Sequence, residues 1–199
     1  HWAKTYIEEA VKYGFVSGYT DGTFKPDNPI TRAEFTKMLN SAIGNTAETD
    51  INFPDVKSGK WYYNDVQKGV AAGFISGKSN GDFAPDAKIT RQETAVMLSR
   101  IVPTSGSNAT LKVYSDYKNV EYWAETALEK ITAKGYLGAY NDGKLHPKDN
   151  LTRGQAAKIL TLVLQKETID KNNKRIVAHD GSDIVLKDTI YSNNMTIDA

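Results

Sequence analysis

The 199-residue chain contains no cysteine, so it has no disulfide framework, no thiol nucleophile and no cysteine-ligated metal site. Its 25 Lys and Arg residues nearly balance 24 Asp and Glu residues, which removes the usual electrostatic argument for nucleic acid as a partner. No apolar run approaches the roughly 20 residues that span a membrane, so we expect no membrane insertion. No secretory signal opens the sequence, and we expect a mature or trimmed polypeptide.

Catalytic signatures are also scarce. The only histidines are His1, His146 and His179, and the sequence contains no H-E-x-x-H, G-x-S-x-G or P-loop motif. Its acidic turns do not follow the spacing of a calcium loop. We therefore expect no enzyme activity, no metal and no cofactor, although the many Asp and Glu residues leave a catalytic carboxylate pair open.

What the sequence does contain is a threefold internal repeat. The tryptophans Trp2, Trp61 and Trp123 are separated by 59 and 62 residues. A Thr-Arg pair follows each tryptophan 29 residues later, and two glycines and a proline keep the same register in between. These landmarks are Thr31-Arg32, Thr90-Arg91 and Thr152-Arg153; Gly14, Gly73 and Gly135; Gly22, Gly81 and Gly143; and Pro26, Pro85 and Pro147. The chain is therefore three copies of a unit of about sixty residues.

Each unit is predicted to be a helix, a loop and a second helix, which makes the fold mainly α. In the first copy, an i, i+4 apolar stripe runs from the tryptophan to Val11. Gly14 then suits the left-handed end of a helix, and Asp21-Gly22 suits a tight turn. The second helix begins at the Thr. Short extended segments, 53–56 and 114–117, are expected before the later tryptophans.

The repeats are expected at residues 1–44, 53–102 and 112–167, and the first lacks its front edge. Polar segments join them. Residues 168–199 break the pattern, because they carry short β-favouring runs at 184–186, 190 and 195–197. This β-rich tail is either the start of a following domain or a frayed end.

Each Thr begins a capping box, because a Glu or Gln follows three residues later. That pattern does not explain Arg32, Arg91 and Arg153, which stand where the helix dipole disfavours a cation by roughly 0.3–1 kcal/mol. A guanidinium beside the free amides of a helix start is a strong site for an anion such as a carboxylate. We favour ligand binding for the three arginines. Pairing with Asp55 or Asp116, which we include among the candidate site residues, is the alternative.

Aromatic residues supply further candidates. We predict that Trp2, Trp61 and Trp123 pack mainly in the core, with a ligand contact as a second role, because the apolar face of a sugar packs on an indole ring. Tyr19 and Tyr140 occupy equivalent loop positions and are candidate ligand contacts, whereas the second copy has a lysine there.

The Trp-led helix, the sequence G-F-V-S-G-Y-T-D-G-T-F-K-P at 14–26 and I-T-R-A-E at 30–34 resemble the S-layer homology domain, in three copies over about residues 1–167. The resemblance implies three repeats in a pseudo-threefold, spindle-like arrangement. It implies non-covalent anchoring of a surface protein to a pyruvylated amino-sugar polymer of the cell wall, held in grooves between repeats. Arg32, Arg91 and Arg153 match the family's binding arginine.

The resemblance also implies an extracellular location, at the cell surface, cell wall or S-layer of a Gram-positive bacterium. Departures in the second and third copies, together with the missing leading segment of the first, lead us to expect that at least one groove binds weakly. A protein-interaction or self-assembly module of a surface layer is the alternative function. A hydrolase is more remote, because three near-equal repeats are a poor way to build one asymmetric active site.

Overall fold

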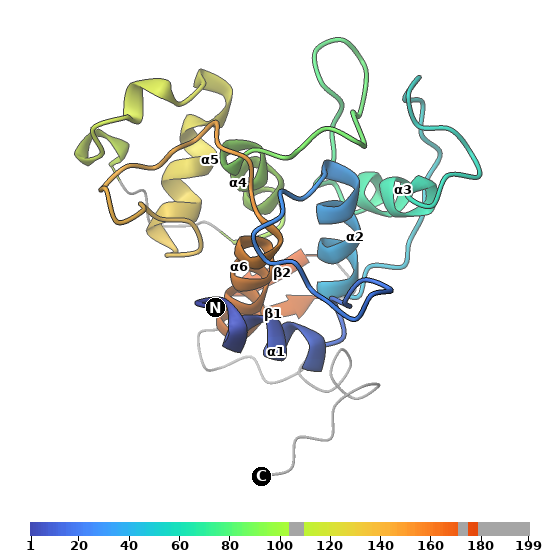
Figure 1. Cartoon of the computed structure of the whole chain (residues 1–199). Coiled ribbons are helices and arrows are strands. Elements are labelled where there is room, and N and C mark those ends of the chain that lie inside the picture. The colour runs from blue at the N-terminus through green and yellow to red at the C-terminus, as the bar shows by residue number, and fades with distance from the viewer. Residues whose placement is uncertain (104–109, 171–174, 179–199) are drawn as a thin grey trace.

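A computed structural model describes residues 1–103, 110–170 and 175–178. The described chain forms α1 (Lys4–Lys12), α2 (Arg32–Ala42), α3 (Tyr63–Ala71), α4 (Arg91–Ser99), α5 (Tyr122–Ala133) and α6 (Arg153–Lys166), with 3-10 turns at Leu111–Val113 and Tyr117–Asn119. Strands β1 (Glu167–Asp170) and β2 (Arg175–Ala178) pair antiparallel after α6. Each repeat supplies two helices joined by a loop (Figure 1). The predicted mainly α fold is confirmed.

The three repeats close around a shared centre. Ile30 donates its backbone N–H to the carbonyl of Leu151, Leu151 donates to Ile89, and Ile89 donates back to Ile30, at 2.8–3.1 Å. All three side chains are fully buried. The ring of hydrogen bonds gives the molecule its pseudo-threefold arrangement.

The helices follow the same symmetry. The second helix of each repeat packs against the first helix of the next, as α2 on α3, α4 on α5 and α6 on α1. Figure 1 shows α2, α4 and α6 near the middle of the molecule, with α1, α3 and α5 around them. The three repeats in the described residues therefore form a closed ring, because α6 packs against α1.

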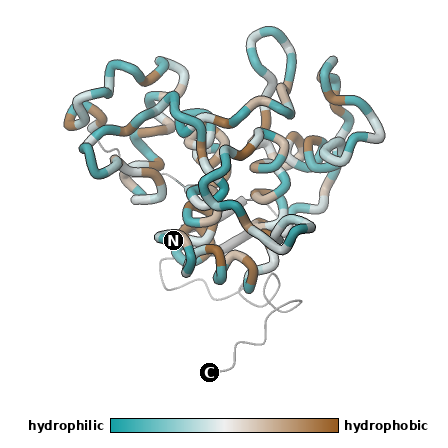
Figure 2. Tube along the Cα trace, in the orientation of Figure 1, coloured by the Kyte–Doolittle hydropathy of each residue, from teal (hydrophilic) through white to brown (hydrophobic). Residues whose placement is uncertain are grey.

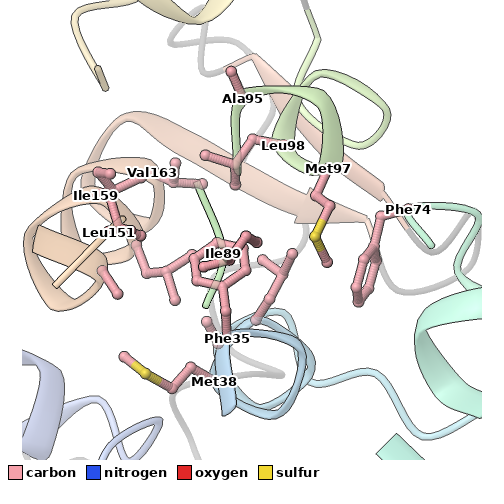
Figure 3. Close-up of a cluster of buried hydrophobic side chains, with 14 of the residues drawn as sticks. Phe35, Met38, Phe74, Ile89, Ala95, Met97, Leu98, Leu151, Ile159 and Val163 are labelled. Atoms are coloured by element: carbon pink, nitrogen blue, oxygen red, sulfur yellow. The ribbon is translucent and has the colours of Figure 1, made fainter. Parts of the chain in front are cut away.

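The core lies between the second helices. Figure 3 shows Phe35 of α2, Leu98 of α4 and Val163 of α6 among the side chains that converge there, and each is at most 1% exposed. The loops between helices are mostly hydrophilic (Figure 2). Burial of these apolar side chains is the main source of stability in such a fold.

The helix ends confirm two predictions. Thr31, Thr90 and Thr152 each cap the second helix of their repeat, with both hydrogen bonds of the capping box present. Each first helix ends at a glycine with positive φ, between 73° and 80°. At the first of these ends, Phe15 donates its backbone N–H to the Ala10 carbonyl at 3.2 Å, as in a Schellman motif.

The prediction that the tryptophans pack in the core is wrong. Trp2, Trp61 and Trp123 are 54%, 55% and 56% exposed. The reason is the phase of the first helix, because the residue after each tryptophan takes the inward position. That residue is Ala3, Tyr62 or Ala124, and all three are buried.

Three smaller expectations also differ. Val11 is 52% exposed rather than part of the core stripe. Helices α1 and α3 begin two residues after the tryptophan rather than at it. Residues 53–56 form a turn, in which Val56 donates its N–H to the Phe53 carbonyl at 3.1 Å, and 114–117 also turn. The β-favouring runs at 184–197 lie outside the described residues.

Candidate functional site

The loop of each repeat has an unusual backbone just before its proline. Lys25, Ala84 and His146 occupy this position with φ of 52°, 59° and 49°. Side chains other than glycine rarely adopt this left-handed region. Its presence in three equivalent loops indicates that the surrounding contacts hold the turn in one shape.

Carboxylates hold two of these turns. Asp55 accepts the backbone N–H of Phe83 at 2.9 Å and that of Ala84 at 2.6 Å. Asp116 accepts the equivalent amides of residues 145 and 146 at 2.9 and 2.8 Å. In the described part of the chain, neither carboxylate forms an ion pair with an arginine. Both are therefore engaged in fixing loop shape.

The arginines connect neighbouring repeats. The Nε atom of Arg32 donates to the Phe83 carbonyl at 2.8 Å, Arg91 to the carbonyl of residue 145 at 2.8 Å, and Arg153 to that of residue 24 at 3.0 Å. Only 5–8% of each arginine is exposed. The cation at the helix start thus bonds a carbonyl of the turn described above, on a different repeat. Burial lowers the pKa of Arg32 and of Arg91 from the ordinary value.

Tyrosines cover two of the three arginines. The guanidinium carbon of Arg91 lies 4.4 Å from the ring centroid of Tyr140, and that of Arg153 lies 4.5 Å from Tyr19. Such stacking is favourable because the ring face is electronegative. Gln155 also donates to the Tyr140 hydroxyl at 2.7 Å. These two tyrosines, predicted as ligand contacts, therefore lie across the faces of the arginines.

Arg32 has polar neighbours instead. Its Nη1 atom donates to the Glu93 carboxylate at 3.2 Å. Lys78, which replaces the loop tyrosine, lies with its Nζ atom 3.7 Å from the same carboxylate oxygen. Glu93 opposes the lowering of the Arg32 pKa by burial. The Arg32 guanidinium carbon also lies 5.1 Å from the ring centroid of Phe83. The Arg32 site is thus a charged cluster that lacks the covering tyrosine of the other two sites.

A cavity of about 580 Å³ opens beside Arg32. We call it the Arg32 groove. It is lined by residues from all three repeats: Arg32, the loop 75–79, Glu93, Val96, Met97, Arg100 and Trp123. The exposed indole of Trp123 provides an apolar wall beside the charged groups. A groove of this composition can hold an anionic ligand that also has an apolar face.

The structure brings the predicted residues together in unequal sets. Arg32 and Trp123 share the groove, while Arg91 and Arg153 each pair with a tyrosine. The ring of Trp61 has the Lys37 Nζ atom 5.7 Å from its centroid, and that of Trp2 lies 5.2 Å from the His1 ring.

Sequence reasoning missed Glu93 and Arg100 as groove residues. Glu93 was explained by its capping box, and it still serves that box while it pairs with Arg32. Arg100 stands at the end of α4, and no motif points to it. Besides the predicted Arg32 and Trp123, the sequence shows Lys78 as a departure from the tyrosine of the other copies.

Within the described residues, no group of three or more His, Cys, Asp or Glu side chains could hold a metal ion. No helix in the same residues is both long and apolar enough to cross a membrane.

Three interlocked helix–loop–helix repeats, with a groove formed where they meet, define a tandem-repeat binding module. Comparison with known families gives the same result. The S-layer homology domain matches residues 1–36, 52–95 and 113–157, which together make up more than half of the chain. The chain belongs to the S-layer homology domain family.

Similar proteins include an enzyme, a surface-layer protein and an anchoring protein. An endoglucanase from Bacillus sp. (strain KSM-635) is 33% identical over 83% of this chain and 18% of its own length. The surface-layer 125 kDa protein of Lysinibacillus sphaericus is 30% identical over 91% of the chain and 16% of its own. The cellulosome-anchoring protein of Acetivibrio thermocellus is 32% identical over 76% of the chain and 36% of its own length.

The chain therefore spans between 16% and 36% of the length of these three relatives. The family and the surface-layer relatives confirm the expected location, at the cell surface of a Gram-positive bacterium.

Proposed function

We propose that the chain anchors a surface protein to the bacterial cell wall by binding an anionic wall polysaccharide, without catalysing a reaction. The Arg32 groove is the observation that carries this proposal. The bound group is a carboxylate on a sugar, such as a pyruvate ketal on an amino sugar. The surface-layer and cellulosome-anchoring relatives support the anchoring role.

The groove has a chemical partner for each part of such a ligand. Toward the described residues, Arg32 uses two of its five N–H donors, which leaves donors for a carboxylate. Lys78 adds a second cation on a flexible stem. The ring of Trp123 can pack on the apolar face of the sugar, and Glu93 can accept a hydroxyl or amide hydrogen.

The rim residues are better test positions than the arginines. Because each arginine is buried and bonds a carbonyl of another repeat, its removal would damage the fold as well as the site. Lys78 and Trp123 are more exposed, so Lys78→Ala and Trp123→Ala should leave the fold intact. Tyr122→Ala is a matched control, since Tyr122 is 92% exposed and does not line the groove.

The experiment is a pull-down with purified cell-wall sacculi, before and after chemical removal of pyruvate. We expect the native chain and Tyr122→Ala to bind the untreated wall, and Lys78→Ala and Trp123→Ala to bind it roughly tenfold or more weakly. Equal binding of the native chain to depyruvylated wall would exclude the carboxylate mechanism. Release of reducing ends from the polymer would contradict a purely binding role.

A further inference from the structure

The Arg32 groove carries more positive charge than one carboxylate can neutralise. Three cations, Arg32, Lys78 and Arg100, line it together with one anion, Glu93. Glu93 lies within ion-pair distance of both Arg32 and Lys78. The groove therefore has an excess of two positive charges.

Arg100 is the cation without an acidic partner. Its Nη1 atom donates to the neutral carbonyl of Phe74 at 3.1 Å, and no carboxylate in the described residues forms an ion pair with it. Partial burial lowers the pKa of Arg100, and its charge in turn opposes protonation of Arg32. An anion bound beside Arg100 in the groove would raise the pKa of Arg100 and of Arg32, because a nearby opposite charge favours the charged form of each guanidinium.

The excess is particular to this groove. The residues equivalent to Arg100 are Ser41 in the first repeat and Leu162 in the third, and neither is charged. The residues equivalent to Lys78 are tyrosines that stack on the other two arginines. Pseudo-threefold packing alone therefore does not require a cation at position 100.

The size of the groove suits a ligand longer than one charged group. Its volume of about 580 Å³ falls within the range of roughly 300–1,000 Å³ that is usual for small-molecule sites. A single carboxylate bound by Arg32 and Lys78 would leave Arg100 unpaired along the same cavity.

We propose that the Arg32 groove selects a glycan segment with two negative charges, and that Arg100 is the specificity-determining residue that binds the second one. The inference rests on the proposed wall-binding function and narrows its ligand to a dianionic class. The first anion binds at Arg32 and Lys78, and the second, on the same or the adjoining sugar, binds at Arg100.

Isothermal titration with two synthetic ligands tests the proposal. One is a disaccharide of N-acetylhexosamines with a single pyruvate ketal, and the other carries an additional carboxylate on the neighbouring sugar. We expect the native chain to bind the dianionic disaccharide roughly tenfold or more tightly, as for one charge-assisted hydrogen bond. Arg100→Ser, which copies the first repeat, should lose that preference, because it should weaken binding of the dianionic disaccharide more than binding of the monoanionic one.

Controls separate a specific role from a structural one. Arg100→Lys should retain part of the preference, since it keeps the charge but not the planar fork. The thermal midpoint of each variant, measured without ligand, shows whether the fold persists. If the native chain binds both disaccharides equally, or if Arg100→Ser weakens both equally, the inference is wrong while wall binding stands. If neither disaccharide binds and the sacculi pull-down also fails, the proposed function is wrong as well.

Discussion

A single carboxylate fixes the loop that faces Arg32. Asp55 accepts the N–H groups of Phe83 and Ala84, and the Phe83 carbonyl then accepts from Arg32. In Asp55→Asn an NH2 group would face a backbone donor, so we expect the free energy of unfolding to fall by about 1–3 kcal/mol. Urea denaturation followed by circular dichroism measures the loss. The control Asp50→Asn, at an exposed position, should change the free energy of unfolding by less than about 0.5 kcal/mol. Equal losses in the two variants would contradict the role of Asp55 in fixing the loop.

A second prediction at the residue scale concerns high pH. Burial and the hydrogen bond that Tyr136 donates to the Glu167 carboxylate raise the pKa of Tyr136 above its ordinary value. Above about pH 10 the tyrosine ionises in the unfolded chain but stays protonated in the fold. The unfolded state then binds fewer protons, so stability falls with rising pH, by at most about 1.4 kcal/mol per pH unit from this group.

The measurement is urea denaturation of the native chain and Tyr136→Phe between pH 8 and pH 11. The decline above pH 10 should be shallower in Tyr136→Phe. It should not vanish, because the pKa values of Tyr13 and Tyr62 are also raised. Parallel pH profiles for the two proteins would contradict the prediction, because they would show that Tyr136 has the same pKa in the folded and unfolded chain.

At the scale of the element, the capping boxes make a local contribution to each second helix. The Thr90 hydroxyl accepts the Glu93 N–H at 3.3 Å at the start of α4. We expect Thr90→Ala to lower the free energy of unfolding by about 1 kcal/mol. Thr90→Ser retains a capping hydroxyl and should lose much less. An equal loss in both variants, measured by thermal denaturation, would assign the effect to the lost methyl group instead of the cap.

These helix ends were predictable because their signals are local. A Thr with Glu or Gln three residues later, or a glycine after an apolar stripe, determines its own hydrogen bonds within one turn. The position of the tryptophans was not predictable in the same way, because residues 2 and 3 can each begin the apolar stripe. Only packing against α6 decides that Ala3 faces inward.

The site was predictable only in part, for a related reason. The arginines stood out because a cation at a helix start is unfavourable. Their acceptors did not, since Arg153 bonds the Phe24 carbonyl 129 residues away. Lys78 could be identified as a departure from the repeat. Arg100 could not, because only the structure shows that it lines the same cavity as Arg32 and Trp123.

At the scale of the whole molecule, symmetry of the backbone coexists with asymmetry of the sites. The same carbonyl accepts from the same arginine position in all three repeats. Tyr19 and Tyr140 then stack on two of these arginines, and Lys78 leaves the third beside an open cavity. This arrangement supports the expectation that the three grooves differ in affinity.

The closed ring predicts that the three repeats unfold together. Ile30, Ile89 and Leu151 are joined by hydrogen bonds that cross every repeat boundary, and α6 packs on α1. Loss of one repeat would expose the centre of the other two, so partial unfolding is unfavourable. Each repeat has one tryptophan, and three variants, each with the other two tryptophans changed to Phe, report on the repeats separately by fluorescence.

In each single-tryptophan variant, we expect the fluorescence transition in urea to coincide with the circular dichroism transition of the same variant. Leu160→Ala, which removes a fully buried side chain of the third repeat, should cost about 2–5 kcal/mol and shift all three reporters equally. Repeats that fold independently would give a different result, because only the Trp123 reporter would move. Equal shifts therefore require the interlocked arrangement. Because the Arg32 groove is assembled from residues of all three repeats, it should disappear in the same unfolding transition.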